Sequence, residues 1–357
     1  MKKLFAIIIL IGAWYMGIAQ ISPATQHGPA CGSDPMNQQL HQHNPQVLQF
    51  QQLLENTWYR QQKSGQSPSS RQVYTIPTVV HIIHNGGPAN ISDQQVDQAI
   101  SAMNDAFRNR GAFNPQTGLD VEIEFCLAAQ DTNGNSTNGI TRTTSSLTNF
   151  VMETQDLQVK ALSRWDPSLY LNIYVVNSIT SRSSGPGVAG YAYFPSSHAN
   201  PEDGIVGEVA YFTAQAGEIS VFVHEAGHYL GLYHTFQGGC GNNDCLQDGD
   251  RVCDTPPDAS TRVVACSGSL NSCRTDDDDR SANNPFRPVS LGGLGDQPDM
   301  HINYMDYGDP NCYSAFTAGQ KDRMVLALTS ARASLLQSKG CGRPCLQTIT
   351  AGFSMGG

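Results

Sequence analysis

The sequence predicts an α+β protein in which a regular part precedes an irregular part held together by disulfides. Apolar strand patterns and a strongly periodic helix pattern occur between residues 73 and 234, as expected for a sheet covered by helices. Residues 237–300 are instead rich in Gly, Asp, Asn, Pro and Cys and show little periodicity. An irregular stretch of this length needs disulfides or ions to hold it in a compact fold.

The chain begins with the pattern of a secretory signal peptide. A charged start at residues 1–3 precedes a short apolar run and a small-residue cleavage site at Ala19. The run is short for a bilayer span. We therefore expect residues 1–19 to be removed on export and the protein to be secreted.

Residues 20–71 differ in composition from the rest of the chain. They are rich in Gln, Ser, Pro and Asn, with one weakly amphipathic stretch at 47–59. Such a segment is either a linker or a pro-segment, and we favour a pro-segment. Its polar end, residues 67–71, suits proteolytic cleavage.

The regular part starts with a β-branched, apolar stretch at residues 73–84, which predicts a buried strand. Ser92 and Gln95 resemble a capping box, and an apolar stripe follows them, so residues 92–108 are predicted to be a helix. The other predicted elements are two strands, two rim strands and a last helix, at residues 121–128, 170–176, 191–194, 205–212 and 317–336.

The most informative motif is HEAGHYLGLYH at residues 224–234, on a helix expected to begin near residue 219 or 220. His224 and His228 are four residues apart and share one helix face. Glu225 points elsewhere, so it can act on a metal-bound water without binding the metal. Gly231 can end the helix in a left-handed turn, which would bring His234 to the same ion. Three histidines and an open position predict a catalytic zinc site.

Two other functional classes remain open from the motif alone. One is a non-catalytic, zinc-stabilised binding or adhesion protein, although such a protein has no need for Glu225. The other is a metallohydrolase that acts on esters or glycans. The net charge of −10 argues against nucleic acid or an anionic membrane as a partner.

Several further motifs, in order, resemble the pappalysin family of metzincin proteases, the relatives of pregnancy-associated plasma protein A. They are the zinc motif, a Met-turn candidate and flanking segments, at residues 128–142, 224–240, 249–250, 254–256, 303–307, 312 and 316–320. The resemblance covers roughly residues 73–335. It implies a metzincin-like metalloprotease domain at 72–340 and a C-terminal tail at 341–357. The upper subdomain (72–234) would carry a twisted mixed sheet and the zinc helix, and the irregular lower subdomain (235–340) the Met-turn.

The resemblance implies a secreted zinc endopeptidase acting on proteins or peptides, which we expect to be a monomer. Zinc would supply a hydroxide near neutral pH, and Glu225 would take and return the proton as general base. Tyr307 matches the family position whose phenol assists at the oxyanion, although it could also be only a packed aromatic. Met305 would form an apolar floor under the histidines.

Ten cysteines in an exported chain point to disulfides. Cys31 could bind zinc as a thiolate in a latent form, as in family members with such a cysteine, or form a disulfide, for instance with Cys126. Setting these two aside leaves eight. The resemblance suggests Cys240–Cys273 and Cys266–Cys312, and proximity in sequence suggests Cys245–Cys253 and Cys341–Cys345.

The family is known for calcium near an Asp-rich loop, so Asp250, Asp254 and Thr255 are candidate calcium ligands. The alternative is a solvated loop held by disulfides alone. The four adjacent aspartates at 276–279 cannot easily converge, so we expect them to be solvated. Some relatives prefer a basic residue after the scissile bond because an acidic residue precedes the cysteine after the Met-turn. Asn311 stands there, with Asp309 nearby, so the sequence leaves a preference for Lys or Arg open.

Overall fold

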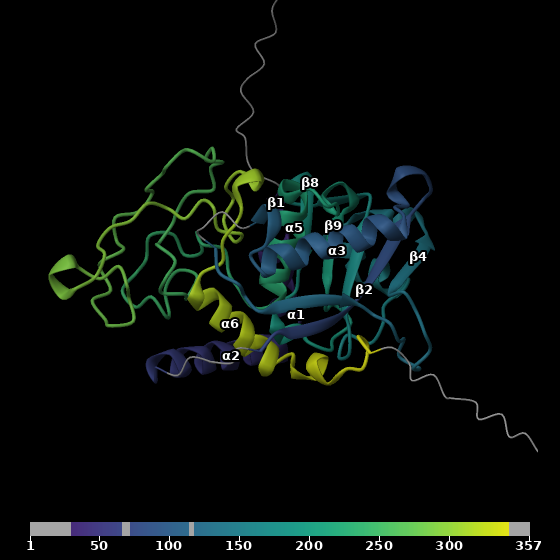
Figure 1. Cartoon of the computed structure of the whole chain (residues 1–357), viewed down its shortest axis with the longest axis horizontal. Helices are drawn as coiled ribbons and strands as arrows, with labels where there is room; N and C mark the ends of the chain where they lie inside the picture. Colours follow the sequence, from purple (N-terminus) through teal and green to yellow (C-terminus); the bar gives the residue numbers. More distant parts are fainter. Residues whose placement is uncertain (1–29, 66–71, 114–117, 343–357) are drawn as a thin grey trace, which may run out of the picture.

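A nine-stranded mixed sheet forms the centre of the computed structural model, which describes residues 30–65, 72–113 and 118–342 (Figure 1). The predicted signal peptide, the predicted cleavage zone at 67–71 and most of the tail lie outside these residues. The strand order is β3-β2-β6-β9-β8-β7-β5, with β1 paired to β8 and β4 paired to β2. The strands are β1 Ala30–Cys31, β2 Tyr74–His84, β3 Ile123–Leu127, β4 Ile140–Thr144, β5 Asn149–Val151, β6 Leu171–Val176, β7 Ser178–Ser181, β8 Gly185–Ala192 and β9 Ile205–Glu208.

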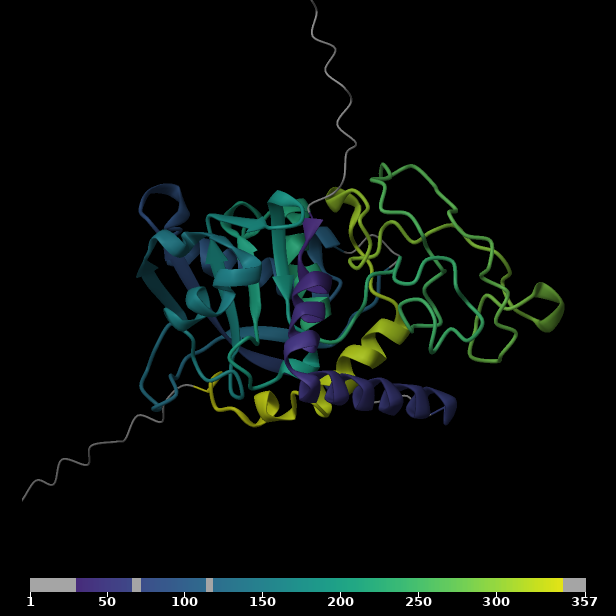
Figure 2. The same ribbon diagram turned by 180° about the vertical axis from the view of Figure 1, so that it is seen from behind.

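Helices cover both faces of this sheet. They are α1 Ser33–His43, α2 Pro45–Lys63, α3 Asp93–Phe107, α4 Met152–Ala161, α5 Ala216–Tyr229 and α6 Ala318–Thr329. One apolar core joins α3 and α5 to β2 and β6, and these helices lie in front of the sheet in Figure 1. A second core joins α1 and α4 to the opposite face, which Figure 2 brings forward. Because both faces are covered, β6 is buried along its whole length.

The main predicted elements of the regular part are confirmed. Strand β2 lies within 73–84, and α3 lies within 92–108 behind a capping box in which Ser92 and Gln95 bind each other's backbone. The strands predicted at 121–128 and 170–176 are also confirmed, as β3 and β6. The predictions of a rim strand at 205–212 and of a last helix at 317–336 need correction. Strand β9 lies between β6 and β8, so it is central and not a rim strand. The last helix is broken after Thr329 and continues as a 3₁₀ turn at Ala333–Gln337.

Residues 30–65 are more ordered than their polar composition suggests. They form one short strand and two helices, with Met36, Leu40 and Trp58 buried. The sequence predicts only a weakly amphipathic stretch at 47–59. The polar residues of α1 make specific contacts with the rest of the protein instead of forming an apolar stripe.

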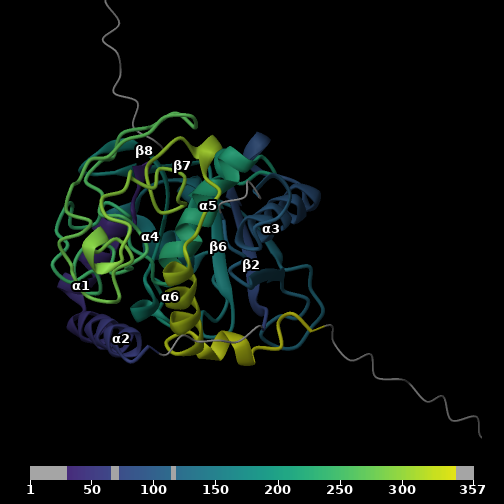
Figure 3. The ribbon, with the colours of Figure 1, turned by 60° about the vertical axis from the view of Figure 1, so that its left-hand side comes forward.

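The chain between α5 and α6 is irregular, as predicted, and appears as the green loops in Figure 3. Three predicted disulfides are present: Cys240–Cys273, Cys245–Cys253 and Cys266–Cys312.

The prediction for Cys341 is wrong, because this residue pairs with Cys126. The end of the described chain lies beside β3, where Ala129 N donates to Gly340 O at 2.7 Å. Proximity in space, not in sequence, therefore decides the pairing. The predicted partner Cys345 lies outside the described residues. The alternative Cys31–Cys126 disulfide is also wrong, since Cys31 is a free thiol.

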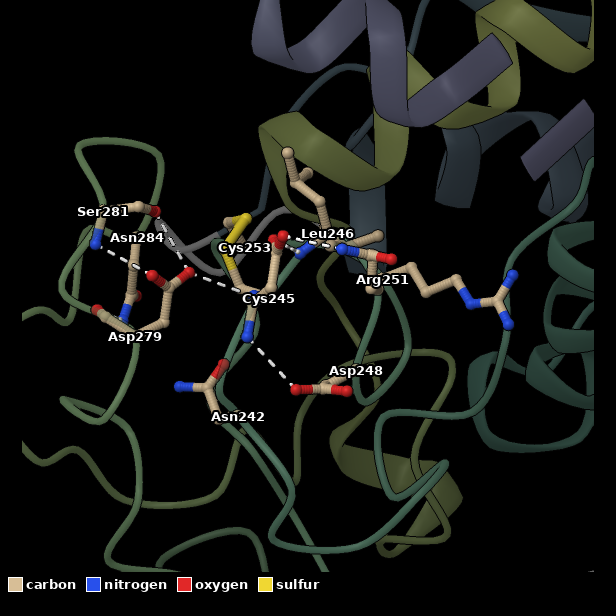
Figure 4. The surroundings of a disulfide bond; sticks show 12 residues. Asn242, Cys245, Leu246, Asp248, Arg251, Cys253, Asp279, Ser281 and Asn284 are labelled. Carbon is tan, nitrogen blue, oxygen red and sulfur yellow. Dashed lines mark hydrogen bonds between the residues drawn. A yellow bond between two sulfur atoms is a disulfide. The ribbon is translucent and has the colours of Figure 1, made fainter. Parts of the chain in front are cut away.

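The aspartates at 276–279 are not uniformly solvated, which corrects the second prediction for this part. Asp276 and Asp279 are buried, whereas Asp278 is exposed. Figure 4 shows Asp279 beside the Cys245–Cys253 disulfide, where its Oδ2 accepts the Cys245 N–H at 3.0 Å. Asp276 Oδ2 accepts the Gln297 N–H at 3.0 Å. The first and last aspartates of the run turn inward to accept from loop backbone N–H groups, which an irregular fold cannot pair in a ladder.

The candidate calcium residues are engaged by donors of the protein. Asp254 accepts from Thr317 Oγ1 at 2.7 Å and from Gly319 N at 2.9 Å, at the start of α6. Asp250 Oδ1 accepts the Val252 N–H at 3.0 Å, and Oδ2 lies 2.8 Å from Thr255 Oγ1. In the described part of the chain, neither aspartate belongs to a cluster of His, Cys, Asp or Glu that could hold a metal. The structure thus lends no support to the calcium site.

The described helices include none that combines the length and apolar character of a membrane span.

Burial raises the pKa of Asp250 to about 7, which makes its contribution to stability depend on pH. Between the usual pKa of 3.8 and about 7, the folded state holds a proton that the unfolded state has lost. Stability should therefore fall as pH rises through this window, by at most about 1.4 kcal/mol per pH unit. Asp250→Asn removes this contribution, so its free energy of unfolding should rise relative to wild type from pH 4 to 7.

Urea unfolding of both proteins at several pH values, in chelator, measures this difference. A difference that stays constant with pH would contradict the assignment. Repeating the series with calcium chloride tests the calcium site, which requires a larger stabilisation of wild type than of Asp250→Asn.

Candidate active site

Helix α5 places His224, Glu225 and His228 in the centre of the protein. These are three of the four residues to which the zinc motif assigns a chemical role. All residues from Ile219 to Tyr229 are buried, and α5 packs against α3 and the sheet. Its C-terminal carbonyl, Tyr229 O, accepts a hydrogen bond from Arg332 Nε at 2.8 Å. Gly231 then adopts φ +94°, the left-handed conformation predicted for it. This turn brings His234 back towards the helix.

The three histidines converge through their Nε2 atoms. His228 Nε2 lies 3.0 Å from His224 Nε2 and 3.2 Å from His234 Nε2. Each Nδ1 atom faces an acceptor. The acceptor for His224 is Tyr304 O at 2.6 Å, and for His228 it is Leu232 O at 2.7 Å. For His234 it is Asp34 Oδ2 at 3.1 Å. Each Nδ1 therefore carries the proton, and three Nε2 lone pairs face one another in a buried space.

This donor set fits a zinc ion. Facing lone pairs repel each other unless a cation lies between them. Zn–N bonds of about 2.0–2.1 Å in a tetrahedron separate the nitrogens by about 3.3 Å, close to the spacing observed. Burial, and the positive charge of the neighbouring histidines, lowers the pKa of His228 well below its usual range, as burial chiefly does for His224. Neutral imidazoles are the form that binds metal.

Met305 and Tyr307 lie where the resemblance implies. A Cβ atom on Gly227 would stand 2.4 Å from Met305 Sδ, so this glycine allows the Met-turn to pack directly under α5. The Met305 side chain is buried, and its carbonyl accepts the Thr235 N–H at 3.1 Å. The Tyr307 ring lies 5.1 Å from the His234 ring. Burial, as the largest cause, raises its pKa well above the usual range.

Residues 30–34 enter this site from the N-terminal segment. Strand β1 runs parallel to β8, and Gly32 N donates to Gly190 O at 2.8 Å. Cys31 Sγ joins the three histidine nitrogens in one cluster whose ligand atoms all lie within 4.8 Å of one another. The Cys31 N–H also donates to Tyr307 Oη at 3.1 Å. The structure thus brings together the predicted Cys31, histidines and Tyr307.

Glu225 is held by the same segment. Ser33 Oγ donates to Glu225 Oε2 at 2.8 Å, and Cys31 Sγ lies 3.6 Å from that oxygen. Burial raises the pKa of Glu225 to about 8. Burial, followed by the charge of Glu225, also raises the pKa of the Cys31 thiol well above its usual range.

Two residues of the site, Ser33 and Asp34, are not predicted by the sequence motifs. Ser33 binds Glu225, and Asp34 binds the Nδ1 atom of His234. Their position directly after Cys31-Gly32 is the one sequence signal that could have pointed to them. The pairing of β1 with β8 carried no sequence signal, since two residues make no detectable pattern.

A small pocket lies beside Glu225 and the zinc cluster. Cys31, His224 and Glu225 line it on one side, and the rest of its lining is largely apolar and aromatic, with a second carboxyl at Asp306: Ala189, Val221, Asp306, Tyr307, Pro310 and Tyr313. Burial raises the pKa of Asp306 to about 8. Asn311 is exposed and does not line this pocket; its side-chain amide donates to Asp309 Oδ1 at 2.9 Å.

Known proteins are similar to this chain in both sequence and fold. The model of the family described as pregnancy-associated plasma protein-A matches residues 153–329. An extracellular metalloprotease of Pyricularia oryzae is 31% identical over 280 residues, which cover 76% of this chain and 80% of that protein.

Two solved structures from Tannerella forsythia have the same fold. A mutant of promirolysin is 28% identical with a TM-score of 0.63, covering 86% of this chain and 97% of its own. Mature mirolysin in complex with a cleaved peptide is 30% identical with a TM-score of 0.57, covering 78% of this chain and 99% of its own. The similarity extends far beyond the zinc motif, and the chain belongs to the pappalysin family of metzincin zinc metalloendopeptidases, whose named relatives are extracellular.

Proposed function

We propose that this protein is a secreted endopeptidase made as a latent precursor, in which residues 20–71 are a pro-segment and Cys31 occupies the zinc site until that segment is removed. The observation that carries the proposal is the cluster of Cys31 Sγ with the Nε2 atoms of His224, His228 and His234. Bound zinc would favour the thiolate of Cys31 although burial in the protein alone raises the pKa of this thiol. A thiolate in the fourth position would exclude the water that an open catalytic site requires.

Zinc, when bound, supplies Lewis acidity and lowers the pKa of a coordinated water towards ~7. Glu225 is the group of this chain positioned to take the proton of that water and to return it to the leaving amine. Its buried setting beside the pocket favours proton uptake near neutral pH. Tyr307 Oη is the donor available to a developing oxyanion once the Cys31 backbone no longer binds it.

The N-terminal segment contacts each of these groups. Cys31 lies at the metal position, Ser33 binds Glu225, and the Cys31 N–H binds Tyr307. A simple linker has no reason to contact all three of these groups, so the contacts favour a pro-segment over a linker. The promirolysin structure also covers more of this chain than mature mirolysin does, 86% against 78%, which supports the assignment of residues 20–71 as a pro-segment.

A non-catalytic binding protein gains no support from this site. The buried carboxyl of Glu225 costs free energy in the fold, and a structural zinc site would gain nothing from keeping it next to the metal.

Glu225→Gln and Glu225→Ala should keep the zinc but lose activity by at least ~10²–10⁴-fold, because the general base is gone. The measurements are casein hydrolysis after pro-segment removal and zinc content by elemental analysis. Glu225→Gln is the matched control for shape, since it retains an acceptor for Ser33. Hydrolysis at the wild-type rate by either variant would show that Glu225 is not the base.

Cys31→Ala should shorten the latency of the precursor. Losing a contact worth about 1.4 kcal/mol multiplies the open population roughly tenfold, so the lag before self-activation should shrink by at least about this factor. Cys31→Ser controls for polarity and size. The time course of casein hydrolysis by freshly purified precursor is the readout. A Cys31→Ala precursor as latent as wild type would rule out the switch.

A further inference from the structure

The helix α2 docks on a surface that the proposed catalytic chemistry does not use. Asn44 separates α1 from α2, and the chain turns there, so that α2 runs beside α6 in Figure 2. Its contact residues Gln51, Glu55 and Trp58 are spaced i, i+4 and i+7, which places them on one helix face. They face Tyr233, Arg251 and Arg323 of the protease domain.

Glu55 is the electrostatic centre of this contact. Its Oε1 lies 2.5 Å from Arg323 Nη2, and its Oε2 lies 3.0 Å from Arg251 Nη1. Tyr233 Oη donates to Oε1 at 2.9 Å. The Glu55 side chain is only 12% exposed and that of Arg323 only 6%. Charge pairs this well shielded interact more strongly than surface pairs.

Trp58 is the apolar anchor. It is 2% exposed, and its Nε1 donates to Arg251 O at 2.7 Å. The Arg323 guanidinium lies 5.6 Å from its ring centre, and Pro195, Gly231 and Ala327 line the crevice around it. A buried tryptophan beside the shielded Glu55–Arg323 ion pair is the composition of a binding hot spot.

Arg323 is held in place by a contact that does not involve α2. Arg323 Nε donates to Gly231 O at 2.7 Å, so the turn after α5 fixes the guanidinium. Without α2, Arg251 and Arg323 would share no carboxylate, and their like charges would favour an acidic occupant. The surface therefore selects a helix with a carboxylate and, three residues later, a large aromatic residue.

We infer that Tyr233, Arg251 and Arg323 form a binding site for such an acidic–aromatic helix, and that this site retains residues 45–63 after the chain is cut between residues 64 and 71. The inference rests on the proposed role of residues 20–71 as a pro-segment. A single cut there leaves both anchors intact, one at Cys31–Asp34 and one at α2. The nicked protein is then a non-covalent, latent complex.

The test uses the full chain with residues 66–70 replaced by the recognition sequence of a specific protease, and with Glu225→Gln to prevent self-digestion. After cleavage, gel filtration shows whether the N-terminal fragment co-elutes with the protease domain. The expected result is co-elution for the parent and loss of the fragment, with binding weakened at least ~100-fold, for Glu55→Gln and Trp58→Ala. Leu53→Ala, which changes an exposed residue of the same helix, should retain the fragment.

A competition experiment avoids any effect of the substitutions on folding. A synthetic peptide of residues 44–64, added to the nicked parent, should displace the fragment's α2 and bind at least ~100-fold more tightly than its Glu55→Gln form. Release of the parent fragment on cleavage, or equal retention of parent and both variants, would overturn the binding site.

Activity of the nicked protein with Glu225 restored separates the two proposals. Nicked Cys31→Ala protein that keeps its fragment and gains activity supports both. If it keeps its fragment but stays fully latent, the thiol switch fails while the α2 site stands.

Discussion

The mutual approach of three imidazole nitrogens is the constraint on which the rest of the structure depends. His228 Nε2 lies within 3.2 Å of both other Nε2 atoms, and lone pairs facing one another in a buried space are unfavourable unless a cation joins them. The protein maintains this arrangement by fixing every ring through its Nδ1 atom. Two of the three acceptors, Leu232 O and Tyr304 O, are backbone atoms of the turn after α5 and of the Met-turn. The histidine cluster thus requires both turns to be in place.

The irregular part of the chain between α5 and α6 places the Met-turn against α5. It lacks long strands or helices, so its backbone donors need other partners. Disulfides limit its freedom, and buried aspartates such as Asp276 and Asp279 accept its loop N–H groups. The close approach of Met305 to Gly227 leaves no room for a side chain at this position of the helix. A regular sheet and an irregular loop region are therefore joined directly beneath the metal site.

In the proposed mechanism, latency and catalysis use the same atoms. The N-terminal segment places a thiol at the metal position, a hydroxyl on Glu225 and a backbone N–H on Tyr307, so it occupies the positions that a substrate and a water would need. The N-terminal segment binds the rest of the protein at two places, through the polar contacts of residues 31–34 and through α2. Dividing the contact lets each part be of moderate strength while the two together hold the segment, because the second contact forms within the same molecule.

The sequence by itself determined the chemistry, since the residues from His224 to His234 are close along the chain. Helical spacing fixes His224 and His228 relative to each other, and Gly231 makes the returning turn possible for local steric reasons. Apolar periodicity likewise predicted β2 and α3. Only the tertiary structure decided the roles of Ser33 and Asp34, the Cys126–Cys341 disulfide and the docking of α2. These contacts join residues far apart in the sequence, 192 positions for Ser33 and Glu225 and 215 for Cys126 and Cys341. No local periodicity or propensity encodes which distant partner a short polar segment will meet.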